Sequence, residues 1–126
     1  MRARSWFLVA ALCMAPGAAL AEPPRAARTP AEEQFRQGRE ALAVGNYAEA
    51  LARFRSSHEL EPGRGKLLNI AICEQKLGKL AAAERHFREV EMQLEARDER
   101  VAIVQQHLAE LRPLVPHLRM DLAGST

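Results

Sequence analysis

Two stretches of the chain decide its fold: GNYAEALARF at residues 45–54 and GKLAAAERHF at residues 78–87. Each opens with a glycine, carries alanine at the sixth place and ends in phenylalanine, and the second begins 33 residues after the first. A helical unit that cannot bury its own apolar face must stack on a copy of itself, so its sequence returns at a fixed period. We therefore expect a fold made of stacked helical units.

Capping residues and breakers mark the first two helices. Thr29 and Glu32 form a capping box, and Pro30 suits the first helical position, so a helix should start here and run to Gly45. Asn46 caps a second helix, which should end near Leu60 because proline and glycine follow.

Three further helices are expected. The third should span about residues 66–77 and the fourth about 80–96, with Gly78 between them. Asp98 should cap the fifth, and prolines fray its end. Its spacing of apolar residues predicts one buried stripe: Val101, Val104, Leu108, Leu111 and Val115.

With a period close to the ~34 residues of tetratricopeptide repeats, the chain resembles that family. The family's small, turn, aromatic and closing residues match Gly38, Gly45, Tyr47, Ala50, Phe54 and Pro62 in the first unit. The second unit holds Ala71, Gly78, Leu80, Ala83 and Phe87 at the same places, without the closing proline. The aromatics of the family's first helices are missing, and Gln34, Ala41, Leu67 and Glu74 stand there.

The resemblance implies an all-α fold: two tetratricopeptide units stacked as a short solenoid, at residues 30–62 and 64–96, and a capping helix at 98–112. Residues 22–29 read as a flexible lead. In the tail, residues 113–126, the alternation of Leu118, Met120 and Leu122 indicates a strand. It has no partner strand in the chain, so the tail is the start of a truncated β segment, a strand that pairs elsewhere, or disordered.

Residues 1–21 have the layout of a secretory signal peptide: two arginines, an apolar run and an Ala19-Leu20-Ala21 cleavage site. A retained membrane anchor is the alternative, but the run is short for a span. The mature protein should therefore be exported, to the periplasm or cell envelope, without a stable membrane span. Cleavage removes two of the 18 basic residues, which leaves 16 against 16 acidic ones and no electrostatic case for nucleic acid.

Enzymatic chemistry is not expected. None of the four histidines lies at metal-ligand spacing from another histidine or from Cys73, so we predict no metal and no cofactor. Cys73 occupies a packed place in the repeat and should be a small buried residue rather than a nucleophile.

The resemblance instead implies a protein-binding module, an adaptor that receives a peptide or partner helix in the concave groove formed by the first helix of each unit. The groove positions carried over are Phe35, Arg36, Arg39, Leu68, Asn69, Ile72 and Lys76, with Glu32 and Gln75 beside them. Asn69 matches the family's clamp asparagine, whereas Phe35 and Arg39 replace the other clamp residues. The arginines could instead pair with Glu32 or Glu40, and Asn69 could bond within its helix. Two alternatives stay open: self-association through the bare face of the first unit, and an anchoring or regulatory role in a larger envelope assembly.

Overall fold

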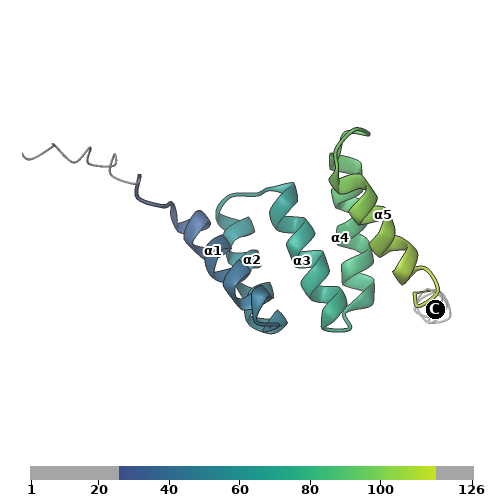
Figure 1. Ribbon diagram of the computed structural model, residues 1–126, viewed down its shortest axis with the longest axis horizontal. Coiled ribbons are helices and arrows are strands. Elements are labelled where there is room, and N and C mark those ends of the chain that lie inside the picture. Colours follow the sequence, from purple (N-terminus) through teal and green to yellow (C-terminus); the bar gives the residue numbers. More distant parts are fainter. Residues whose placement is uncertain (1–25, 116–126) are drawn as a thin grey trace, which may run out of the picture.

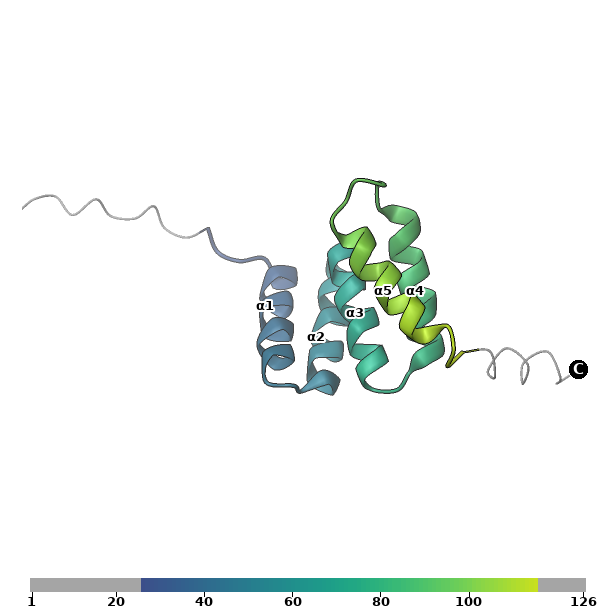
Figure 2. The ribbon, with the colours of Figure 1, turned by 45° about the vertical axis from the view of Figure 1, so that its right-hand side comes forward.

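The computed structural model describes residues 26–115, which form five helices packed side by side (Figure 1). They are α1 (Pro30–Ala43), α2 (Tyr47–Leu60), α3 (Arg64–Lys76), α4 (Leu80–Gln93) and α5 (Arg100–Leu111). Each helix packs on the next, and α5 crosses in front of α4 (Figure 2). The expected all-α class is thus confirmed for this range, where no helix is long and apolar enough to cross a membrane. The predicted signal peptide and the strand-like segment lie outside the described residues.

The predicted caps of α1 and α2 are formed. Thr29 Oγ1 accepts the backbone N–H of Glu32 at 3.2 Å, and the Glu32 carboxylate accepts the N–H of Thr29 at 2.8 Å. Asn46 Oδ1 accepts the N–H of Glu49 at 3.3 Å. These contacts satisfy N–H groups that the first turn of a helix leaves without partners.

The two turn glycines adopt one conformation. Gly45 and Gly78 have φ of 75° and 76°, in the left-handed region that glycine enters without the cost a side chain would add. The same bond closes each turn, from Asn46 N–H to Ala41 O at 2.9 Å and from Lys79 N–H to Glu74 O at 2.8 Å. The repeat seen in sequence is therefore a repeat in backbone geometry.

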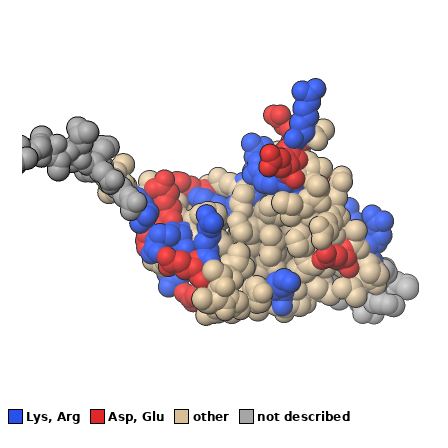
Figure 3. Space-filling model, viewed as in Figure 1, with Lys and Arg blue, Asp and Glu red and all other residues tan. Residues whose placement is uncertain are grey.

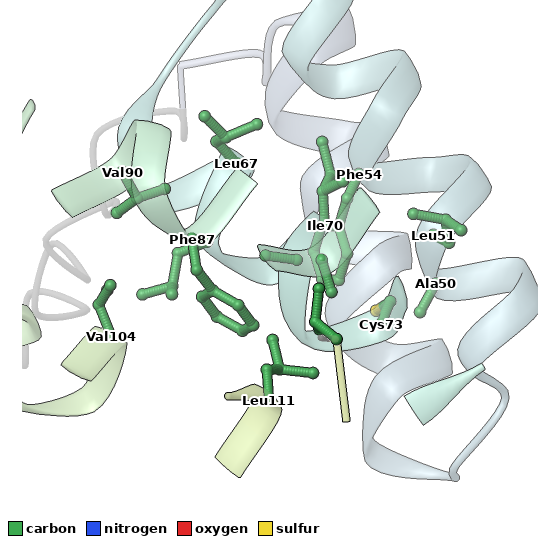
Figure 4. Packing of buried hydrophobic residues seen from close by; sticks show 14 residues of the cluster. Ala50, Leu51, Phe54, Leu67, Ile70, Cys73, Phe87, Val90, Val104 and Leu111 are labelled. Carbon is green, nitrogen blue, oxygen red and sulfur yellow. The ribbon is translucent and has the colours of Figure 1, made fainter. Parts of the chain in front are cut away.

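Small residues let the paired helices approach closely, and phenylalanines fill the space between them (Figure 4). Ala50, Phe54, Ala83 and Phe87 have no exposed surface. A Cβ placed on Gly38 would lie 2.7 Å from the ring of Phe54, so α1 and α2 meet at a distance that only glycine permits.

The second unit departs from the expected boundaries. Helix α3 begins at Arg64, two residues early, because Gly63 is extended (φ −164°, ψ 138°) and its carbonyl accepts the first helical bond from Leu67. Helix α4 ends at Gln93, three residues before the expected Ala96. Leu94 turns out of the helix (ψ 141°) and packs against the core. The packing of its side chain is thus favoured over another turn of α4.

Helix α5 completes the core. The predicted stripe is correct: Val104, Leu111 and Val115 are buried, with Val101 and Leu108 half-buried. The residue directly before α5 is Glu99, whose side chain makes no capping bond. Asp98 caps the helix instead, since its Oδ1 accepts the N–H of Arg100 at 2.9 Å. Its carboxylate also pairs with the Arg100 guanidinium at 2.6 Å.

These contacts make the start of α5 sensitive to acid. The hydrogen bonds from the Arg100 side chain and backbone lower the pKa of Asp98 from 3.8 to about 2. A depressed folded-state pKa stabilises the protein above the unfolded value, and this contribution is lost as pH falls from about 4 to about 2. We expect Asp98→Asn to flatten the pH dependence of the unfolding free energy in that window. Urea titrations at each pH would measure it, and equal slopes in both proteins would contradict the assignment.

Candidate binding site between α1 and α3

Helices α1 and α3 border an open depression of about 550 Å³. Its lining is Phe35, Arg39, Leu42, Ala43 and Asn69. Three of these, Phe35, Arg39 and Asn69, are predicted groove residues that the fold brings together from two units. Leu42 and Ala43 were missed, although Leu42 lies seven residues after Phe35 and so on the same side of the helix.

The depression combines a donor, an acceptor and an apolar wall. Arg39 is exposed and makes no side-chain hydrogen bond or ion pair within residues 26–115. Asn69 donates its amide N–H to Gly65 O at 2.9 Å. The hydrogen bond of Asn69 within its own helix, which the sequence analysis left as an alternative, is therefore formed. The Oδ1 atom of Asn69 is left to accept, while Phe35 and Leu42 supply apolar surface.

Arg36 does not line this depression and is held by its own helix. Its guanidinium bonds both carboxylate oxygens of Glu33, at 2.6 and 3.0 Å, and also contacts Glu40. The hydrogen bonds from Arg36 and Gln37 lower the pKa of Glu33 to about 2, and Glu33 in turn raises the pKa of Arg36. The expected pairing of an arginine with Glu40 is therefore formed by Arg36. Arg36 also pairs with Glu33, and not with Glu32 as the other expectation had it.

The remaining groove positions differ in how much of them a ligand could reach. Leu68 is buried in the core, and Ile72 is half-buried against it. Lys76, in the last turn of α3, is exposed and makes no side-chain hydrogen bond or ion pair with another described residue. Glu32 belongs to the cap of α1, and Gln75 is turned toward α5, where it bonds His107 at 2.7 Å and Glu110 at 3.1 Å.

A buried carboxylate lies at the centre of the stack. Glu74 of α3 has no exposed surface, and it accepts hydrogen bonds from Arg55 of α2 at 2.8 Å and contacts His86 of α4 at 2.7 Å. Sequence reasoning found Glu74 only as a departure from an aromatic place. Because both partners come from other helices, the cluster ties α2, α3 and α4 together.

Beside this cluster, Cys73 is fully buried, as expected. Burial, with the nearby Glu74 charge, raises the pKa of its thiol from 9.0 to about 11. The thiol therefore stays protonated at neutral pH, which is the wrong state for a nucleophile.

Known proteins offer no direct guide to this site. No family model matches the chain, and no curated protein or solved structure matches it either. Within residues 26–115, no group of three or more His, Cys, Asp or Glu side chains is placed to hold a metal ion. The site must be interpreted from its own chemistry.

Proposed function

We propose that this chain is an exported, non-enzymatic adaptor of the tetratricopeptide type, which binds an extended peptide segment of another protein between α1 and α3. The observation that carries the proposal is the depression lined by Phe35, Arg39 and Asn69. The tetratricopeptide assignment is supported by the equal turns at Gly45 and Gly78 and by the equal burial of Phe54 and Phe87.

Recognition would use the backbone of the peptide and one apolar side chain. The Arg39 guanidinium donates to a carbonyl or carboxylate oxygen, and Asn69 Oδ1 accepts a peptide N–H. An apolar side chain packs on Phe35 and Leu42, which are already ordered against the core. Lys76, exposed in the last turn of α3, favours an acidic residue in the same segment.

Self-association through the first unit has less support. The side of α1 turned away from α2 carries the ion pairs of Arg36 with Glu33 and Glu40. Figure 3 shows acidic and basic atoms gathered at this end of the molecule. A charged outer face is typical of a terminal repeat that ends a stack in water.

Peptide binding can be tested without knowing the natural partner. Random peptides displayed on phage would be selected on the purified protein, and enriched sequences synthesised for calorimetry. We expect Arg39→Glu and Asn69→Ala each to weaken binding by roughly 10–100-fold, because each removes a hydrogen bond, in one case a charged one. Arg85→Glu, an exposed change on α4, is the matched control and should bind like the parent.

Two results would overturn this proposal. One is the absence of any enriched peptide under conditions where the protein is folded by circular dichroism. The other is an enriched peptide whose affinity neither α1 nor α3 substitution changes.

A further inference from the structure

Next to the depression, a second row of side chains lies where α3 meets α5. The two helices run in the same direction and come together at two levels (Figure 1). At their first turns, a Cβ placed on Gly65 would lie 3.8 Å from the Arg100 guanidinium. At their last turns, Gln75 donates to Glu110 at 3.1 Å, across a sequence separation of 35 that Gly65 and Arg100 share. The two helices therefore keep one register over this length.

That register predicts an apolar row between the two levels. Three residues beyond the first contact, Leu68 of α3 lies beside Ile103 of α5. Seven residues beyond it, Ile72 lies beside His107. Leu68 is buried, Ile72 is half-buried, and Ile103 is open, with 44% of its surface accessible. We call Leu68, Ile72 and Ile103 the α3–α5 seam.

His107 holds the seam in place. Its Nδ1 lies 2.7 Å from Gln75 Oε1, and since an amide oxygen only accepts, this nitrogen carries a proton. The His107 ring also stacks on Phe87 of α4, with centroids 4.8 Å apart and planes 8° apart. Because both contacts fix α5 against α3, the seam is formed before any ligand arrives, which lowers the ordering cost of binding.

The seam continues the depression across α3. Asn69 and Ile72 lie one turn apart on the open side of this helix, and Asn69 lines the depression while Ile72 lines the seam. Packed helices have axes 8–10 Å apart, so the seam lies about one such spacing from the depression. In Figure 3 the surface over α3 and α5 is mostly uncharged. A segment that leaves the depression over α3 thus reaches further apolar surface.

We propose that the peptide held in the depression continues into the seam in the polyproline II conformation, and that it fills the seam with a second apolar side chain three residues from the first. This inference rests on the proposed function and adds a sequence requirement to it. Polyproline II rises 3.1 Å per residue with three residues per turn, so residues three apart share a side and lie about 9 Å apart. Side chains on one side of a β-strand recur at about 7 and 14 Å, which fit one helix spacing less well.

The polar groups along the path fit the same conformation. A polyproline II backbone makes no internal hydrogen bonds, so its carbonyl and N–H groups are available to Arg39 and Asn69. Arg39 and Lys76 are exposed, and neither has an ion-pair partner within residues 26–115. These cations favour acidic residues between the two apolar ones.

Three phage libraries test the spacing. Each displays random peptides with two fixed leucines, placed two, three or four residues apart, and each is selected on the purified protein. We expect the library with leucines three apart to be enriched roughly tenfold over the others. Equal enrichment, or a preference for leucines two or four apart, would overturn the polyproline II register.

Calorimetry with the most enriched peptide tests the seam itself. Ile103→Ser should weaken binding roughly tenfold, because the second leucine loses its apolar contact. Replacing that leucine by alanine should weaken binding to the parent by a similar factor and have little further effect on Ile103→Ser. Met92→Ser, which removes an apolar side chain 80% exposed on α4, is the matched control and should bind like the parent.

The outcomes separate this inference from the function on which it rests. If Arg39→Glu weakens binding and Ile103→Ser does not, the depression binds peptide and the seam does not, so only the inference fails. If no peptide is enriched, or Arg39→Glu has no effect, both fail. Sedimentation velocity covers the remaining occupant: a parent dimer that Ile103→Ser dissociates would assign the seam to a second copy and overturn the inference.

Discussion

Phe54→Ala should lower the free energy of unfolding by about 3–5 kcal/mol, the largest loss we expect from a single truncation. Phe54 has no exposed surface, and its ring fills the space between α1 and α2, where it contacts Phe35 with ring centroids 5.4 Å apart. Small domains are stable by roughly 5–15 kcal/mol in total, so this variant would be close to unfolding at room temperature. Urea denaturation followed by circular dichroism measures the change.

Two further variants separate packing from simple loss of an aromatic ring. Phe35→Ala removes the same ring from a half-buried site and should cost less than half as much. Gly38→Ala should cost about 1–3 kcal/mol despite the higher helix propensity of alanine, because its Cβ would meet the Phe54 ring. Combining Gly38→Ala with Phe54→Leu should be less harmful than the sum of the two. Strict additivity would show that the two sites do not touch.

Most of the fold was predictable because its signals are local. The caps at Thr29 and Asn46 and the glycines at 45 and 78 act within a few residues of themselves, so sequence is enough to place them. The errors, at the start of α3 and the end of α4, are of another kind. Leu94 leaves its helix to pack against the core, and no residue near it in the sequence indicates that contact.

The candidate site was predictable to the same degree. The repeat alignment assigned Phe35, Arg39 and Asn69 to the first helices of the two units, and these two helices border the same depression. The ion pairs of Arg36 with Glu33 and Glu40 can also be predicted from the sequence, because these residues are three and four positions away on the same helix. The contacts of Glu74 are not, since they join residues 19 and 12 positions apart through three helices.

That cluster leads to the second large effect. Removing both partners of Glu74, in an Arg55→Met/His86→Leu variant, should cost about 3–5 kcal/mol, because a fully buried carboxylate would be left without a compensating group. Each single replacement should cost less, since one partner stays. Removing the acid itself is different: Arg55 is 46% exposed at its side chain and His86 19%, so water can solvate both once Glu74 is gone.

Adding Glu74→Leu to the double variant should therefore restore most of the lost stability, since it turns an unpaired buried charge into apolar core. Arg88→Met is the matched control, because it breaks a pair within α4 whose arginine is 55% exposed at its side chain, and it should cost less than about 1 kcal/mol. Urea denaturation of the parent, double, triple and control proteins decides the matter. If the triple variant is no more stable than the double, Arg55 and His86 contribute by packing, and the charge of Glu74 is not what they compensate.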